Sequence, residues 1–190
     1  MNKDDIISLP NTHLRERSQK VGIVGDEAKK VIQGMKQATI DWEESRSHEV
    51  GVALAAIQVD VHLRIVVIRN DFDNKNDKSF SVFINPTITK YEGKLIQDFE
   101  GCLSVPDIYG KIPRYSKVRI KATDENGKEF RVTADGFLAR IFQHEIDHTN
   151  GIVFIDHIKE CSDAFFYLDK EGQLKKLDYE KNIRNNTILW

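Results

Sequence analysis

The sequence contains few cysteines and no long hydrophobic run. Among 190 residues there are 2 cysteines and 4 prolines. Cys102 and Cys161 are too few for the disulfide framework of a small secreted domain. The longest apolar stretches, residues 52–57 and 65–68, are far shorter than the ~20 residues that span a bilayer. These absences exclude a disulfide-stabilised scaffold and predict a protein without membrane contact.

The N-terminus lacks the features of a targeting segment. The stretch MNKDDIISLP has no basic start followed by an apolar run, which a secretory signal would need. Asp4 and Asp5 argue against an organelle transit peptide, because such peptides are usually poor in acidic residues. We therefore expect a cytoplasmic location, in a compartment that keeps thiols reduced.

No excess of either charge is present. The 28 Lys and Arg residues nearly offset the 30 Asp and Glu residues, which leaves a formal charge of -2. This balance argues against a strongly basic nucleic-acid binder, so we expect no stable nucleic-acid binding. Hydrophobic residues make up 40% of the chain, and this share with this length suits one globular domain with a small appendage.

Hydrophobic periodicity predicts two helices. Apolar residues between positions 26 and 45 recur at steps of three and four, which is typical of an amphipathic helix that packs on a core. Residues 136–149 form the second predicted helix, with Asp135 as its N-cap and Gly151 as its stop signal.

The strands predicted between and after the helices are short. Residues 64–69 and 81–86 have the pattern of buried strands, and residues 87–99 predict another strand with a turn near Gly93. Alternating apolar residues on both sides of Asn126-Gly127 predict a β-hairpin. The tail fits either helix or strand, and the mixed order of elements indicates an α+β fold.

The pattern HExxH in the second predicted helix points to a metal site. His144 and His148 are one helical turn apart, so both imidazoles can reach one ion. Glu145 lies about 100° around the helix, where it can address a water molecule on that ion. The alternative is a pair of surface histidines, which the apolar residues on the same helix face argue against.

Two histidines need a third ligand, and several residues are candidates. Phe154 occupies the position at which one class of HExxH protease carries a third histidine, which excludes that class. Glu160 and Glu171 are downstream candidates without a supporting motif. Upstream, Cys102 lies in a glycine-containing turn, and a thiolate with two imidazoles makes a suitable tetrahedral set. Taken alone, Cys102 is more typical of a buried structural cysteine than of a metal ligand.

Three segments together resemble the signature motifs of the peptide deformylase family. GVALAAIQ (51–58), EGCLS (100–104) and HEIDH (144–148) occur in the family's order and at suitable separations. The resemblance spans roughly residues 7–158 and includes the predicted hairpin. Three linked motifs are far more specific than any one of them.

The resemblance implies a fold and an activity. The fold would be α+β, with small antiparallel β-sheets surrounding a central helix that carries HEIDH. The enzyme would be a metal-dependent amidohydrolase that removes the N-formyl group from the formyl-methionine of newly made polypeptides and releases formate. We expect a single catalytic domain over residues 1–158, with a C-terminal extension over 159–190 packed on it or trailing from it.

The resemblance also assigns the catalytic residues. Cys102, His144 and His148 would bind one divalent metal ion, usually Fe(II), with zinc, nickel or cobalt as alternatives. Such an ion would lower the pKa of a bound water molecule, and Glu145 would act as the general acid and base. Gln58, through its side-chain amide, and Leu103, through its backbone N–H, would stabilise the oxyanion.

The substrate contacts follow from the same resemblance. The stretch from Gly51 would pair edge-on with an extended peptide. Phe137 and Ile141 on the second predicted helix are candidates for the methionine pocket, although a core role is equally typical of each. The full set of candidates is Gly51, Val52, Ala53, Glu100, Gly101, Arg114, Phe137 and Ile141.

One departure from the family pattern leaves alternatives open. Ala53 stands where the family usually has glycine, and the added methyl could change the substrate preference. The alternatives are a related metalloamidase that acts on another N-acyl substrate, and an inactive homologue that binds peptide N-termini. The expected partners are nascent formyl-methionyl polypeptides, with the ribosome near its exit tunnel as a further candidate. Cys161 has no assigned role.

Overall fold

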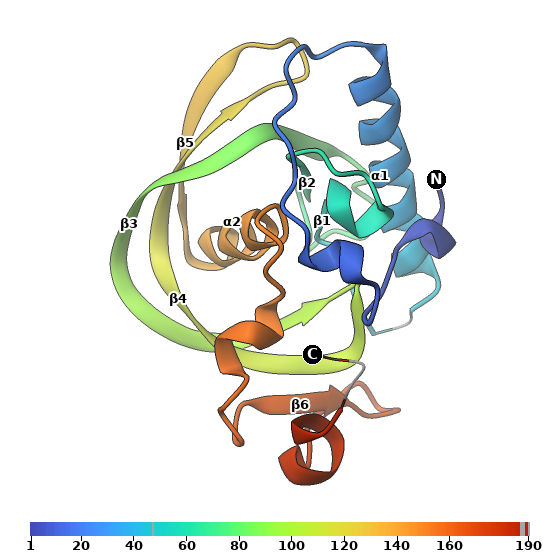
Figure 1. Cartoon of the computed structure of the whole chain (residues 1–190), viewed down its shortest axis with the longest axis vertical. Helices are drawn as coiled ribbons and strands as arrows, with labels where there is room; N and C mark the ends of the chain where they lie inside the picture. The colour runs from blue at the N-terminus through green and yellow to red at the C-terminus, as the bar shows by residue number, and fades with distance from the viewer. Residues whose placement is uncertain (47, 187–188, 190) are drawn as a thin grey trace.

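The chain folds around one helix that a curved β-sheet encloses. The computed structural model describes residues 1–46, 48–186 and 189. In Figure 1, α2 lies at the centre, and β3, β4 and β5 curve around it. The helices are α1 (Asp26–Glu44) and α2 (Gly136–His148), and the strands are β1 (Ala53–Ala55), β2 (Ile65–Arg69), β3 (Phe80–Cys102), β4 (Val105–Thr123), β5 (Glu129–Asp135), β6 (Phe165–Leu168) and β7 (Leu174–Lys176).

The described strands join in one antiparallel sheet. Its order is β1-β2-β3-β4-β6-β7, and β5 pairs with β4 off this path. The fold is the expected α+β arrangement of helices and antiparallel strands. None of the helices in the described part of the chain is both long and apolar enough to cross a membrane.

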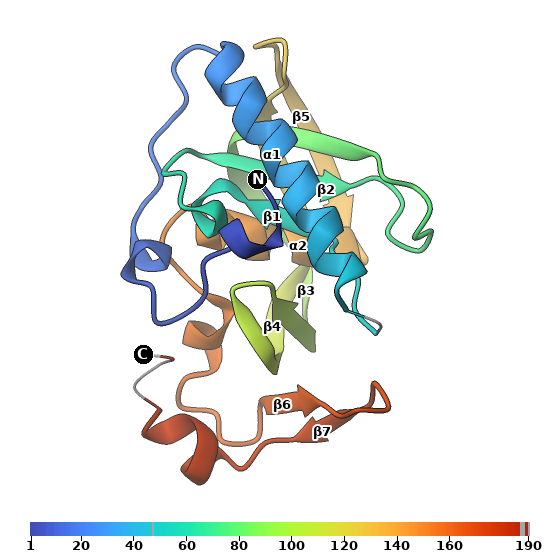
Figure 2. The ribbon, with the colours of Figure 1, turned by 90° about the vertical axis from the view of Figure 1, so that its right-hand side faces the viewer.

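Strand β2 is buried on both faces because a helix covers each of them. Val66 and Ile68 pack into the cluster that contains residues of α2. Ile65 and Val67 point to the other side and pack into the cluster that contains residues of α1. This alternation explains why the predicted strand is apolar throughout. Helix α1 is confirmed at nearly the predicted bounds, and Figure 2 shows it crossing in front of β1 and β2.

The predicted turn near Gly93 is wrong. Strand β3 continues through this region, and its register against β4 shifts between Glu92 and Leu95. Gly93 adopts a φ of +77°, and the N–H of Lys94 donates to Ser116 Oγ. Glycine therefore marks a β-bulge here, which increases the bend of a long strand rather than ending it.

The hairpin and the second helix are confirmed, with one difference. β4 and β5 pair in the predicted register around the Asn126-Gly127 turn, with Val118 opposite Ala134. Helix α2 begins at Gly136, but the Asp135 side chain makes no capping hydrogen bond. Gly136 has a φ of +58° and turns the chain from β5 into the helix.

The segment after α2 folds back onto the sheet. Phe165 and Phe166 in β6 pair with β4, and β7 pairs with β6 as a hairpin at the bottom of Figure 2. Ile183 and Leu189 are buried in a cluster with Phe154. The structure therefore resolves the choice between helix and strand for residues 165–168 in favour of strand.

We predict that Gly151→Ala destabilises the fold more than Gly127→Ala. Both glycines have φ near +80°, which strains any other residue by about 1–2 kcal/mol. At Gly151, a Cβ would also lie 2.4 Å from the Arg15 carbonyl oxygen, whereas at Gly127 nothing lies within 4 Å. Urea denaturation should show a loss in the free energy of unfolding of about 3 kcal/mol for Gly151→Ala and about 1 kcal/mol for Gly127→Ala. Equal losses would contradict this reading.

Candidate metal and catalytic site

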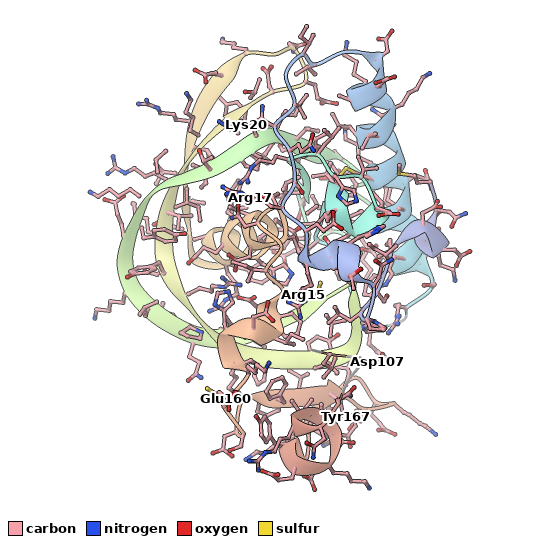
Figure 3. The ribbon with its side chains drawn as sticks, viewed as in Figure 1. Arg15, Arg17, Lys20, Asp107, Glu160 and Tyr167 are labelled. Atoms are coloured by element: carbon pink, nitrogen blue, oxygen red, sulfur yellow. The ribbon has the colours of Figure 1, made fainter. Side chains whose placement is uncertain are left out.

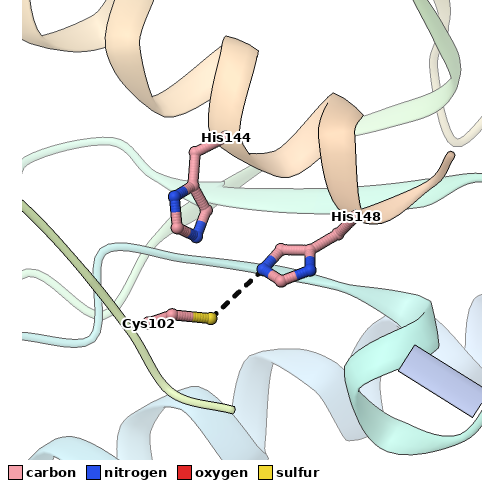
Figure 4. Close-up of side chains that lie close together, drawn as sticks. All are labelled: Cys102, His144 and His148. Carbon is pink, nitrogen blue, oxygen red and sulfur yellow. Dashed lines mark hydrogen bonds between the residues drawn. The ribbon is translucent and has the colours of Figure 1, made fainter. Parts of the chain in front are cut away.

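Three buried donor side chains converge between β3 and α2. Cys102 is the last residue of β3, and His144 and His148 lie one turn apart on α2. Their ligand atoms all lie within 4.8 Å of one another, and Cys102 Sγ is 3.2 Å from His148 Nε2 (Figure 4). A thiolate and two imidazoles are a typical donor set for a transition metal, and three protein ligands leave one position open.

Two polar atoms beside the donor cluster lack a partner, and the pKa values of the two histidines bear on whether the site fits a metal ion. His148 Nδ1 and Glu145 Oε2 are buried and have no hydrogen-bond partner among the described residues. Burial lowers the pKa of His148, which keeps its imidazole neutral, as metal binding requires. Burial also lowers the pKa of His144, but hydrogen bonds to Cys102 and Glu100 raise it above its usual range.

Glu100 fixes the orientation of His144. Its Oε2 lies 2.9 Å from His144 Nδ1, which leaves Nε2 of that ring free to bind an ion. Arg114 donates to both oxygens of Glu100 at 2.8 and 3.0 Å, and Arg140 donates at 2.8 Å. Burial raises the pKa of Glu100, but the hydrogen bonds from His144 and Arg114 hold it well below its usual range. Glu100 is therefore a buried carboxylate with all its charge compensated.

Arg114 belongs to this charge network and does not line the cleft. The guanidinium donates at 2.6 Å to Asp147, which in turn lies 2.7 Å from His157 Nε2. Only 6% of Arg114 is exposed. The predicted contact between Arg114 and the peptide therefore has no support in the structure. The sequence offered no sign that Glu100 and Asp147 meet this arginine, because three separate elements bring them together.

A cleft of about 370 Å³ opens beside the donor cluster. This volume lies in the range of about 300–1,000 Å³ that is typical of small-ligand sites. Residues of β1, the β3–β4 turn and α2 line it. From the predicted set, the lining includes Val52, Ala53, Gln58, Glu100, Gly101, Cys102, Leu103, Phe137, Ile141, His144 and Glu145.

Gly51 lies outside the cleft, against α1. Its N–H donates to Glu43 Oε2 at 3.1 Å. A Cβ at this position would lie 2.7 Å from the Thr39 carbonyl oxygen, so glycine lets the chain approach α1 closely. The structure therefore gives Gly51 a packing role against α1, and its contact with substrate stays a prediction. Val52 and Ala53, the next two residues, do reach the cleft.

Glu145 is the unpaired carboxyl group of the site. It lies on α2 between the two histidines, and 5% of it is exposed. Burial raises the pKa of Glu145 to about 7. A carboxyl group with a pKa near neutrality can accept a proton and return it, which a general acid–base catalyst must do.

Gln58 presents its amide N–H groups to the donor cluster. Its Oε1 accepts from the Ala55 N–H at 2.9 Å, which fixes the direction of the amide. Nε2 then lies 3.4 Å from Cys102 Sγ and 3.2 Å from Ser104 Oγ. The role of Ser104 was not predicted, although it lies within the EGCLS segment that carried the resemblance.

Nine further residues that line the cleft were not predicted from the sequence, among them four that come from four different elements. Trp42 belongs to α1, Tyr109 to β4, Leu168 to β6 and Leu174 to β7. No local motif surrounds any of them. Only the pairing of the β6–β7 hairpin with β4 shows that Leu168 and Leu174 can reach the site.

A second group of donor atoms lies at the surface. His13, Asp60 and His62 have ligand atoms within 4.8 Å of one another. His13 Nδ1 already lies 2.6 Å from Asp60 Oδ1. The hydrogen bond to Asp60 raises the pKa of His13 and so favours an ion pair. These side chains satisfy one another in an exposed position, unlike the buried site.

Comparison with known proteins points to one family. A sequence model described as polypeptide deformylase matches residues 3–164. Peptide deformylase 1 of Pseudomonas syringae pv. tomato is 41% identical over 180 residues, which cover 94% of this chain and 96% of that protein. A peptide deformylase of Chromobacterium violaceum is 44% identical over 126 residues, which cover 66% of this chain and 73% of that one.

Solved structures show the same fold. A peptide deformylase from Synechococcus elongatus in complex with actinonin has a TM-score of 0.73 at 36% identity, over 80% of this chain and 78% of that one. A peptide deformylase from Legionella pneumophila has a TM-score of 0.71 at 38% identity, over 80% and 83%. The sequence and the fold therefore lead to the same family.

We predict that Glu100→Gln weakens metal binding. The substitution removes the charge that orients His144 and compensates Arg114 and Arg140, and loss of such a supporting group costs roughly 10–100-fold in metal affinity. Competition with a chromophoric chelator measures that affinity. Glu92→Gln is the matched control, because Glu92 pairs with the exposed Arg119 away from the site. Unchanged affinity in Glu100→Gln would show that the network does not support the ligand.

Proposed function

Because the chain belongs to the peptide deformylase family, it is an enzyme that removes the formyl group of N-formyl-methionine peptides, and we propose that the cleft beside Cys102 carries out this reaction. The observation that carries the proposal is the convergence of Cys102, His144 and His148 beside the unpaired carboxyl group of Glu145. An acid–base catalyst and a metal-binding donor set are the two parts that metal-dependent amide hydrolysis uses.

In this proposal the two histidines and the cysteine hold one divalent metal ion. The ion would supply Lewis acidity, which polarises a carbonyl group and makes water a better nucleophile near neutral pH. Fe(II) is the ion we propose in the cell, with zinc, nickel or cobalt able to replace it. A thiolate with two imidazoles suits all of these ions, so the donor set supports the site more strongly than it supports any one metal.

Glu145 would move the proton. Its carboxyl group has no protein partner among the described residues and faces the cleft. In the ionised form it would accept a proton from the attacking water molecule, and it would then donate that proton to the amine that leaves. The raised pKa of Glu145 supports both steps, because neither protonation state is strongly favoured near pH 7.

Gln58 and Leu103 would stabilise the negative charge on the formyl oxygen. The amide of Gln58 is held by the Ala55 N–H, so its donor group needs no reorientation during the reaction. Leu103 follows Cys102 directly and lines the same cleft, so its backbone N–H would lie beside the donor cluster. Ser104 Oγ would help to hold the Gln58 amide in place.

The edge of the sheet would bind the peptide backbone. β1 is the first strand in the sheet, and among the described strands it pairs with β2 alone, so its other edge would be available to an extended chain. Val52 and Ala53 line the cleft at this edge, and Phe137 and Ile141 on α2 offer apolar surface for the methionine side chain. Backbone pairing suits an enzyme whose substrates share only their first residue.

The cellular setting is part of the proposal. Peptide deformylases act on nascent formylated polypeptides, which are made in the cytoplasm, so we place this enzyme there. The ribosome near its exit tunnel remains the proposed site of encounter. The catalytic unit we propose is residues 1–158, with 159–190 as an extension whose hairpin joins β4 of that unit.

The decisive experiment is a formate-release assay on the metal-loaded enzyme. Protein purified anaerobically would be analysed for bound metal and then incubated with formyl-Met-Ala-Ser and with acetyl-Met-Ala-Ser. We expect one metal ion per chain and formate from the first peptide only. Release of acetate with no release of formate would overturn the proposed substrate.

We predict that Glu145→Ala retains the metal but loses turnover. Alanine removes the proton acceptor while Cys102, His144 and His148 stay in place, so kcat should fall by at least about 10³-fold. Metal content measured by plasma mass spectrometry should stay at one ion per chain. Retained turnover in Glu145→Ala would remove this residue from the mechanism.

We predict that Gln58→Ala lowers kcat more than it raises KM. The Gln58 amide is proposed to donate to charge that develops only during the reaction, so its loss should cost roughly 10²–10³-fold in kcat. Steady-state kinetics with a formyl-methionyl peptide separate the two parameters. A rise in KM alone would assign Gln58 to substrate binding instead.

A further inference from the structure

The C-terminal hairpin forms one wall of the catalytic cleft. Leu168 in β6 and Leu174 in β7 line the same cleft as Cys102 and Glu145. Both leucines lie beyond residue 164, at which the match to the family model ends. The cleft therefore includes surface that lies outside the residues matched by the family model.

Backbone pairing holds the hairpin against the strands of the site. Tyr109 and Gly110 in β4 pair with Phe166 and Phe165 in β6. The Phe166 ring also packs edge to face on Phe99, with a centroid separation of 4.9 Å. Phe99 lies in β3 three residues before Cys102, so the wall is connected to the strand that carries the proposed thiolate ligand.

Two leucines of the hairpin share the face that meets the cleft. Leu168 and Leu174 are direct cross-strand partners, and such partners lie on the same side of the sheet. The neighbouring pair, Tyr167 and Lys175, therefore points to the opposite side. Tyr167, labelled in Figure 3, is 39% exposed, which agrees with that direction.

The surface facing the hairpin is aromatic, and the polar groups of Tyr109, Glu49 and Arg46 pair with one another beside it. Trp42 and Tyr109 line the cleft with the two leucines. The Tyr109 hydroxyl donates to Glu49, and Arg46 donates to the other oxygen of Glu49 at 3.0 Å. Because these polar groups satisfy one another, the part of the cleft that remains is suited to an apolar group.

We propose that Leu168 and Leu174, with Trp42 and Tyr109, form a subsite for an apolar side chain within the two residues that follow the substrate's methionine. The formyl group must reach the donor cluster, and α2 provides apolar surface for methionine. The β6–β7 hairpin would then offer its apolar surface to the residues that follow the methionine. This inference rests on the deformylase function, and it makes the C-terminal extension a determinant of substrate preference.

Peptides that differ at one position test the subsite. Formate release would be measured for formyl-Met-Leu-Ala, formyl-Met-Ala-Leu and formyl-Met-Ala-Ala, and each kcat/KM would be divided by that of the last peptide. We expect the wild type to favour leucine at one of the two positions. In the Leu168→Ala/Leu174→Ala variant this ratio should fall roughly five- to tenfold, the range expected when a few apolar contacts are lost.

The matched control is Tyr167→Ala/Lys175→Ala, which truncates the cross-strand pair on the opposite face of the same hairpin. It should keep the wild-type ratio, and thermal melting would verify that both variants are folded. An equal fall in both variants, or an unchanged ratio in the leucine variant, would overturn the subsite. Absence of formate from every peptide with wild-type enzyme would overturn the catalytic assignment first, and the subsite with it.

A charge introduced into the wall gives a second test. Leu168→Glu should reverse the preference, so that formyl-Met-Lys-Ala or formyl-Met-Ala-Lys gains at least about fivefold over its leucine counterpart. A residue with only a structural role would not produce such a gain. If Leu168→Glu is folded and shows no gain for lysine, Leu168 does not contact the peptide.

Discussion

One buried carboxylate connects the elements on which the site depends. Glu100 in β3 accepts hydrogen bonds from Arg114 in β4 and from Arg140 in α2, and it orients His144. A buried charge is stable only if its partners compensate it fully. β3, β4 and α2 must therefore reach their final positions together, and the same contacts that satisfy Glu100 also direct the imidazole toward Cys102.

The central helix and its ligands could be predicted because their signals are local. HExxH needs only the geometry of one helical turn, and the apolar period predicted that helix. The third ligand needed more. Cys102 was one candidate among several from the residues alone, and the resemblance between three motifs singled it out before the structure placed it beside His148. The strand over 64–69 and the hairpin were likewise predicted from patterns within a few residues, whereas the strands predicted separately over 81–86 and 87–99 form one long strand, β3.

The errors arose where distant elements meet. Arg114 was expected to contact substrate, but its partners lie in β3 and α2, and no local pattern shows that they surround it. Gly51 was predicted to belong to the peptide-binding edge, and the sequence did not show that it also approaches α1 closely. Gly93 was predicted to lie in a turn because glycine occurs in turns and in β-bulges alike. The wall formed by Leu168 and Leu174 depends on strand pairing across more than fifty residues.

The enclosure of α2 links metal binding to the stability of the whole domain. The two histidines lie on a helix that β3, β4 and β5 surround, and β2 packs on that helix from a further side. Such a helix has no route by which it can unfold locally without opening the sheet. An ion that binds only the folded site would therefore stabilise every element of the domain. Backbone amides of α2 would exchange with solvent at the rate of global unfolding. Loss of the ion would speed exchange in β5 as well as around the ligands.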